Sequence, residues 1–228
     1  EETPYDIDVR QNFLNTLQSV QKRQPDYLII TGDLCLDVGV RETYEWIKAR
    51  LDLVGIPYEV QSGNHDNTRM IAEVFGMENL LVGEELFYKK HFQEYTFYFL
   101  DTSDYQLSQQ QMAWFSDELR TQSGTIYLFI HHPPIYSGVP FMDHGHPLKN
   151  REEVANILLN VANPINVFCG HYHVDKVVRK ANLATYITPS LYFQINDGVE
   201  EFALDHKRIG YREIILEDGM LRTSVRYV

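Results

Sequence analysis

The sequence predicts a mixed α/β (α+β) fold in which β-sheets are packed together and flanked by helices, and two patterns support this class. From residue 9 to residue 169, short apolar runs alternate with amphipathic segments of helical periodicity, as in strands joined by helical crossovers. After residue 173 the chain reads as short strands and turns. With 228 residues, 44% hydrophobic and 23% charged, it fits one globular domain with a sizeable core.

In the first part of the chain each predicted strand is followed by a helix. Four apolar residues at helical spacing predict a helix over residues 9–23, and Pro25 ends the pattern. A short apolar run stopped by Gly32 reads as a buried strand over 27–31. The next predicted elements are a helix at 43–53, a strand at 56–61 and a helix at 69–75.

In the second part, alternation between 86 and 101 predicts two paired strands, the second at 95–100. Ser108 with Gln111, and Asn150 with Glu153, resemble capping boxes and predict that a helix starts at each place, the second one running to about 161. The remaining predicted strands lie at 125–130, 165–169, 183–188 and 191–195, with a hairpin at 211–228 that turns at 217–219.

The net charge and the hydropathy of the sequence indicate which classes of binding partner are expected. A net charge of −12 argues against binding a nucleic-acid polymer, because phosphate backbones are held mainly by Lys and Arg. A small phosphorylated substrate is compatible with this charge, since a bound metal reverses the local field. No apolar run approaches the ~20 residues of a membrane span, so no membrane partner is expected. The sequence leaves open whether the protein forms a homodimer.

The two cysteines, Cys35 and Cys169, are far apart in sequence and form no short-spaced metal motif. We expect both to be buried free thiols in a reducing cytoplasm, although spacing alone leaves a disulfide open.

Polar residues with metal-binding groups follow four of the predicted strands. These residues are Asp33, Asn64, His131 and the pair His171 and His173. In open α/β sheets the carboxyl ends of strands form the crevice where ligands bind, so these side chains are expected to converge. A carboxylate, an amide and several imidazoles suit Fe, Mn or Zn better than Ca or Mg.

Each motif has a plainer interpretation when it is taken alone. Gly32-Asp33 and the Asn64-His65-Asp66 loop could be ordinary hydrogen-bonded turns. His131 and His132 could be one core histidine beside one surface histidine. The repetition at four strand ends favours the metal site.

Four motifs together resemble those of the calcineurin-like metallophosphoesterases. They are Gly32-Asp33, Gly63-Asn64-His65-Asp66, His131-His132-Pro133 and Gly170-His171-Tyr172-His173. The segments 141–150, 188–190, 202–205 and 210–212 further resemble the bacterial class III 3',5'-cyclic-nucleotide phosphodiesterases.

This resemblance implies a four-layer αββα sandwich of two mixed sheets flanked by helices, with a site for two metal ions. Asp33 would bridge both ions, while Asn64, His131 and His171 would complete one and His173 would serve the other.

The resemblance also implies catalytic roles for His65 and Asp66. A hydroxide bridging the metals would attack the phosphodiester of a substrate such as cAMP. His65 would contact the phosphate and protonate the leaving oxygen, and Asp66 would orient His65. The alternatives are a broader phosphomonoesterase or diesterase and a non-catalytic scaffold with a degenerate site.

Substrate contacts are predicted less directly. His132 would stand behind the metal ligands, and the loop after it carries Tyr136, Phe141, His144 and His146, which could line a pocket for a base or sugar. An exposed loop with incidental histidines is the other interpretation.

The family's first motif, Asp-x-His at the end of the first strand, is absent from the 228 residues. Either the second metal site is impaired, or the strand that carries this motif lies ahead of the sequence. Loss of an internal strand would leave backbone groups of its neighbours unpaired in the core, which favours the second explanation. The start at Glu1 rather than Met agrees with it.

Overall fold

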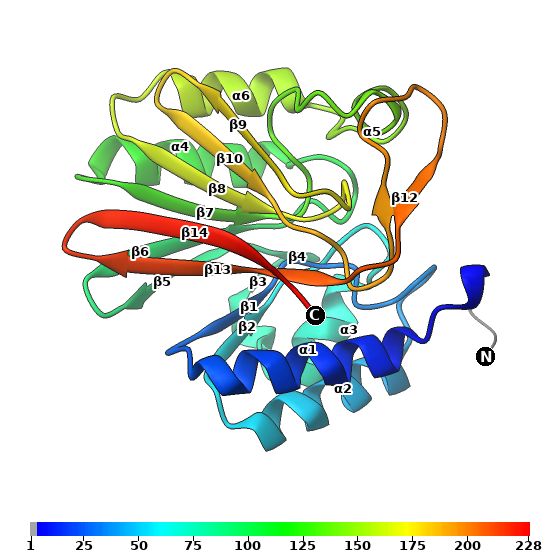
Figure 1. The fold of residues 1–228 in the computed structure, drawn as a ribbon. Helices are drawn as coiled ribbons and strands as arrows, with labels where there is room; N and C mark the ends of the chain where they lie inside the picture. The colour runs from blue at the N-terminus through cyan, green and yellow to red at the C-terminus, as the bar shows by residue number, and fades with distance from the viewer. Residues whose placement is uncertain (1–3) are drawn as a thin grey trace.

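The computed structural model describes residues 4–228 and contains two β-layers between helices (Figure 1). The helices are α1 (Val9–Arg23), α2 (Arg41–Val54), α3 (Thr68–Phe75), α4 (Gln109–Thr121), α5 (Pro140–Gly145) and α6 (Arg151–Leu159), with 3-10 turns η1 (Pro4–Asp6) and η2 (Glu78–Leu80). The strands are β1 (Leu28–Ile30), β2 (Tyr58–Val60), β3 (Leu81–Val82), β4 (Glu85–Leu86), β5 (Tyr88–Phe92), β6 (Tyr95–Leu100), β7 (Ile126–Ile130), β8 (Ile165–Cys169), β9 (Lys176–Lys180), β10 (Leu183–Ile187), β11 (Gln194–Ile195), β12 (Leu204–His206), β13 (Gly210–Glu217) and β14 (Met220–Tyr227).

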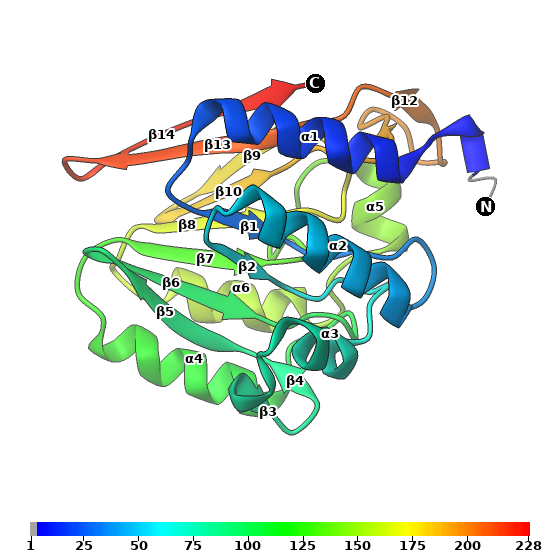
Figure 2. The same ribbon diagram turned by 90° about the horizontal axis from the view of Figure 1, so that it is seen from below.

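The largest sheet has six strands in the order β5-β6-β7-β8-β10-β9. Its four central strands are parallel, and β5 and β9 pair antiparallel at the edges. Helices α4 and α6 cover one face of this sheet, while the parallel pair β1-β2, the hairpin β13-β14 and the helices α1 and α2 lie on the other side (Figures 1 and 2). The predicted sandwich of sheets flanked by helices is confirmed.

Aromatic rings cover the face of the six-stranded sheet that looks toward β1. Tyr88, Phe99, Phe129, Phe168 and Tyr186 stack in a row across five strands, with successive ring centroids 4.7, 5.3, 5.3 and 5.1 Å apart. They belong to one buried cluster with residues of α1, α2 and β2. The opposite face carries a second, largely aliphatic cluster beneath α4 and α6. Burial on both faces explains why the central strands have near-continuous apolar sequences.

Several predicted elements needed correction. The strand expected at 191–195 is reduced to two residues, and β9 and α5 were not predicted. Asn150 precedes α6 but makes no side-chain cap, because its amide exchanges two hydrogen bonds with the backbone of Leu107 instead. Ser108 does cap α4, accepting from the backbone N–H of Gln111 at 3.1 Å.

The cysteine prediction is confirmed, since Cys35 and Cys169 are both buried and neither is in a disulfide. Within residues 4–228, no helix combines the length and the apolar character needed to cross a membrane.

Candidate metal centre

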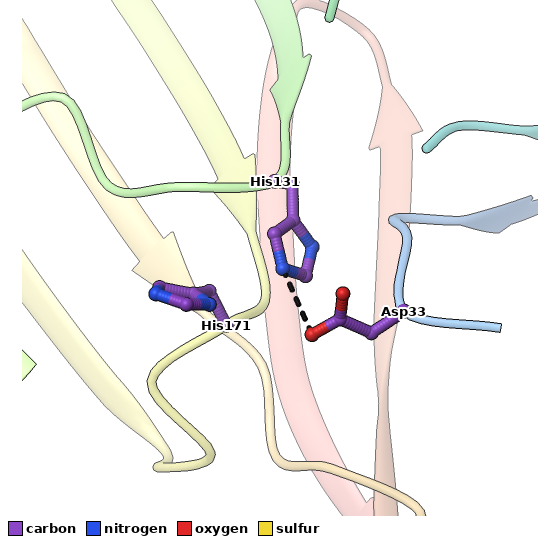
Figure 3. A group of neighbouring side chains, drawn as sticks. All are labelled: Asp33, His131 and His171. Atoms are coloured by element: carbon purple, nitrogen blue, oxygen red, sulfur yellow. Dashed lines mark ion pairs between the residues drawn. The ribbon is translucent and has the colours of Figure 1, made fainter. Parts of the chain in front are cut away.

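The four strand ends named by the sequence meet at one edge of the molecule. Asp33 follows β1, Asn64 follows β2, His131 follows β7, and His171 and His173 follow β8. Ligand atoms of Asp33, His131 and His171 all lie within 4.8 Å of one another, an arrangement that could hold a metal ion (Figure 3). The three side chains come from both β-layers, so only the folded sandwich brings them together.

Two glycines allow the loops of the site to touch. Gly32 has a φ of +97°, and a side chain there would place its Cβ 2.5 Å from the backbone nitrogen of Gly63. A Cβ on Gly63 would lie 2.2 Å from Oδ1 of Asp33. Larger residues at either position would push apart the loops that carry Asp33 and Asn64.

His131 is aimed by a backbone hydrogen bond. Its Nδ1 lies 2.6 Å from the carbonyl oxygen of Thr31, which leaves Nε2 directed at Oδ2 of Asp33, 3.1 Å away (Figure 3). Burial opposes ionisation of Asp33, but His131 outweighs it and holds the pKa of that carboxyl below its usual range. Burial lowers the pKa of His131, but the neighbouring Asp33 carboxylate raises it, and the net result is a pKa above the ordinary value for histidine.

His171 and His173 are kept neutral by their surroundings. Burial, with His132 and His131 nearby, holds the pKa of His171 well below its ordinary value, and burial lowers the pKa of His173 to about 4. Neutral imidazole is the form that ligates metals. The φ angle is positive at three candidate ligands: 60° at His171, 50° at His173 and 54° at Asp33. This backbone conformation is uncommon and tends to occur at functional sites.

Several buried polar atoms at the site make no hydrogen bond to a described residue, among them Nε2 of His132 and two candidate ligand atoms. Oδ1 of Asn64 and Nδ1 of His173 are buried and accept or donate no hydrogen bond. Leaving a buried polar group unpaired costs about 1–3 kcal/mol, so such groups call for an explanation. A bound cation satisfies an amide oxygen and a neutral imidazole nitrogen alike, and the donor set therefore fits a metal.

Asp66 does not contact the ring of the neighbouring His65. The carboxylate of Asp66 makes no hydrogen bond to His65. It accepts instead from the backbone N–H of Gly63, Leu34 and Cys35 and from the hydroxyl of Tyr44, at 2.9–3.2 Å. These contacts tie the Asp33 loop to the Asn64 loop, and the orienting role of Asp66 toward His65 stays a prediction.

The ring of His65 is held by another group, the carbonyl oxygen of Asp37, 3.1 Å from its Nδ1. Its backbone N–H donates to Oδ1 of Asp33 at 3.1 Å, so His65 stays beside the candidate metal ligands.

The residues proposed for substrate contact fall into two groups. His132 is fully buried, with Nδ1 2.8 Å from the hydroxyl of Thr102 and its ring 4.0 Å from that of His171, so it stands behind the ligands. The other four residues lie on α5 or next to it, where their rings form two neighbouring pairs. Tyr136 lies beside His144 and Phe141 beside His146, with ring centroids 6.3 and 5.2 Å apart.

This α5 loop is joined to the site at two points. Nε2 of His171 lies 3.0 Å from the carbonyl oxygen of His146, and the hydroxyl of Tyr172 donates to the buried carboxylate of Asp143 at 3.0 Å. The carboxylate also accepts from Arg151 and from the backbone N–H of Ser137 and Val139.

Sequence reasoning missed Thr102, Tyr105 and Asp143. Thr102 follows β6 just as the ligands follow their strands, so the strand-end pattern could have identified it. The ring of Tyr105, 4.8 Å from His132, carried no local signal. Asp143 lies in the segment 141–150 that resembles the cyclic-nucleotide phosphodiesterases, but nothing in that segment indicates that its carboxylate is buried.

Comparison with known proteins agrees with this geometry. The family model for calcineurin-like phosphoesterases matches residues 7–175, and the chain belongs to that family. It is accordingly a hydrolase of phosphoric esters.

Two relatives and one solved structure illustrate the likeness. A probable cyclic nucleotide phosphodiesterase of Fibrobacter succinogenes is 31% identical over 97% of this chain and 86% of its own. A probable glycerophosphodiester phosphodiesterase, GpdQ, of Arcobacter nitrofigilis is 27% identical over the same shares. A dimetal phosphatase from Danio rerio has the same fold, with a TM-score of 0.64 and 12% identity over 90% of this chain and 84% of its own.

Proposed function

We propose that this protein is a metal-dependent phosphodiesterase that cleaves a small phosphodiester, with a 3',5'-cyclic nucleotide such as cAMP as the leading substrate. The observation that carries the proposal is the convergence of Asp33, His131 and His171 within 4.8 Å at the strand ends. The relatives named as cyclic nucleotide phosphodiesterases support the substrate class.

The residues that would hold two metal ions are Asp33, Asn64, His131, His171 and His173. Their mixture of carboxylate, amide and imidazole groups favours Fe, Mn or Zn. When bound, such ions supply Lewis acidity, which polarises a phosphoryl group and offsets the negative charge that develops on its oxygens. Behind the ions the chain contributes three histidine side chains that are buried from solvent, those of His131, His132 and His171.

His65 is the residue we assign to the leaving oxygen. Because the carbonyl of Asp37 accepts from Nδ1, the proton that can be given away resides on Nε2 when the ring is cationic. General acid catalysis by a positioned histidine contributes about 10²–10⁴-fold to a rate. His65 is partly exposed, so it can reach a substrate that enters from solvent.

The α5 loop would receive the rest of the substrate. Tyr136 and Phe141 offer faces on which a base or sugar can pack, and His144 and His146 offer polar groups beside them. The glycerophosphodiester relative makes a broader diesterase the second candidate.

The test combines metal analysis with hydrolysis of cAMP, a glycerophosphodiester and p-nitrophenyl phosphate, with Mn²⁺ added. We expect about two metal ions per chain and preferential cleavage of cAMP. His65→Ala should lower kcat by about 10²–10⁴-fold with metal content unchanged, while His91→Ala, on the remote strand β5, should leave both unchanged. Wild-type turnover in His65→Ala would refute its role.

The same assay distinguishes the alternatives. Cleavage of the other esters with cAMP untouched would favour a broader esterase, and absence of both metal and turnover would indicate a scaffold.

Two free thiols agree with a reducing compartment such as the cytoplasm. A homodimer stays a prediction, which sedimentation analysis would test.

A further inference from the structure

The turn that follows strand β6 reaches the candidate metal centre from the six-stranded sheet. Strands β6 and β7 are parallel neighbours, so this turn begins beside the end of β7, which is followed by His131 (Figure 2). The carboxylate of Asp101, a residue that is 4% exposed, accepts from the backbone N–H of Ser103 at 2.9 Å. The N–H of Tyr105 donates to the carbonyl oxygen of Thr102 at 2.8 Å. These hydrogen bonds fix the turn at the edge of the sheet where the candidate ligands gather.

Tyr105 ends this turn in an unusual backbone conformation. Its φ angle is +61°, which is uncommon for a residue with a bulky side chain. Such conformations persist where surrounding contacts over-determine them, and they cluster at active sites. Here the N–H of Lys149 donates to the carbonyl oxygen of Tyr105 at 2.7 Å, and the Lys149 ammonium lies 5.4 Å from the centre of the tyrosine ring. The tyrosine is therefore held through both its backbone and its side chain.

The ring of Tyr105 packs against two buried histidines of the site. Its centroid is 4.8 Å from that of His132 and 6.0 Å from that of His171, to which it stands nearly perpendicular at 83°. Tyr105 itself is only partly buried, so it also reaches solvent. A substrate that approaches the candidate metal centre from solvent can therefore contact this residue.

The phenol of Tyr105 is close to two further candidate ligands. Burial raises its pKa and so does the Asp33 carboxylate, whereas a hydrogen bond from Asn64 lowers it, and the net shift is upward. The phenol therefore keeps its proton at neutral pH. Because Asn64 is the donor in this contact, the proton of the phenol stays available for an acceptor atom of a ligand.

We propose that Tyr105 binds the phosphate of the substrate by donating a hydrogen bond from its phenol to a non-bridging phosphoryl oxygen. This inference rests on the proposed phosphodiesterase function and adds a second protein donor to the site. His65, on the loop after β2, is assigned to the leaving oxygen, whereas Tyr105 comes from the other β-layer. The hydroxyl of Tyr105 is near Asp33 and Asn64, which favours a phosphoryl contact over stacking of the ring on a base. A donor placed at the phosphoryl oxygens stabilises the negative charge that develops there.

Binding of inorganic phosphate to the Mn²⁺-loaded protein tests this contact without any turnover. Calorimetric titration should give a Kd about 10- to 100-fold higher for Tyr105→Phe than for wild type, the effect of one hydrogen bond to a charged group. The value of kcat/KM for cAMP should fall by a similar factor. Phenylalanine keeps the ring against His132 and His171, so a purely structural role predicts no change. Metal content and the circular dichroism spectrum should equal those of wild type.

The matched control is Tyr95→Phe, which removes a hydroxyl at the start of β6, the end of the strand that is remote from the site. Its phosphate affinity and turnover should equal those of wild type. Unchanged phosphate affinity in Tyr105→Phe would overturn the proposal, as would absence of phosphate binding to wild type. Loss of metal in Tyr105→Phe would also overturn it, because the phenol would then be a metal ligand. So would slower cleavage of cAMP at unchanged phosphate affinity, which would indicate a contact with the base.

The proposed hydrolysis can fail separately from this contact. If wild type binds phosphate but cleaves none of the esters, the proposed function is refuted, while a raised Kd in Tyr105→Phe would still support the phosphate contact. If wild type and Tyr105→Phe cleave cAMP equally well and bind phosphate with the same Kd, only the role of Tyr105 is refuted.

Discussion

Replacing Asp143 by asparagine should destabilise the protein and loosen the candidate metal centre together. The carboxylate is fully buried and accepts from Arg151, from Tyr172 and from the backbone N–H of Ser137 and Val139. Asparagine keeps the shape but removes the charge and turns an NH₂ group toward these donors. Breaking one partner of a buried ion pair costs about 3–5 kcal/mol, and we expect a loss of that size in the free energy of unfolding.

Urea denaturation followed by circular dichroism measures this loss, with Asp104→Asn as the matched control. Asp104 is an exposed acid three residues after the buried Asp101, and its substitution should change stability by less than about 0.5 kcal/mol. Metal content is the second readout, since Tyr172 lies between His171 and His173. A loss below about 1 kcal/mol in Asp143→Asn, or a loss equal to that of the control, would refute the assigned role.

Three other substitutions test the geometry of the site. Gly63→Ala should cost about 1–3 kcal/mol and reduce metal content, because its Cβ would collide with Asp33; a fully loaded, equally stable variant would show that the loops need not approach so closely. His173→Ala should reduce bound metal, measured by mass spectrometry, while leaving the circular dichroism spectrum unchanged; undiminished metal would remove His173 from the ligand set. In chelated protein, a lowered pKa means that ionised Asp33 stabilises the fold above its unfolded pKa of 3.8, and this contribution is lost as pH falls further. The difference in unfolding free energy between wild type and Asp33→Asn should therefore shrink between about pH 5 and about pH 3, and a constant difference would contradict the ion pair with His131.

The ligand positions could be predicted from sequence because each depends on a local pattern. An apolar run of strand length, followed within four residues by a side chain with a ligand atom, identifies Asp33, Asn64, His131 and His171 without any knowledge of tertiary contacts. Strand β9 was missed because Lys176–Lys180 is a charged edge strand, whose sequence lacks the apolar character of the central ones.

The roles of Asp66 and Asn150 could not be predicted in the same way. Both were interpreted through neighbours in sequence, His65 and Glu153, whereas their hydrogen bonds reach other parts of the fold. Asp66 binds the backbone of residues 34 and 35, and Asn150 binds Leu107. When a side chain can form hydrogen bonds with either a sequence neighbour or a distant residue, the local sequence does not indicate which of the two it binds.

Hydrogen bonds to distant parts of the fold also stabilise the unusual backbone conformation at the site. Asp33, His171 and His173 all have left-handed φ angles, which cost roughly 1–2 kcal/mol for each residue with a side chain. Such conformations persist only where surrounding contacts over-determine them. Asp66 fixes the loop after Asp33 through two backbone N–H groups, and Asp143 holds Tyr172 between the two histidines. The carboxylates of Asp66 and Asp143 thus help to set the positions of the predicted ligands, although neither belongs to the predicted ligand set.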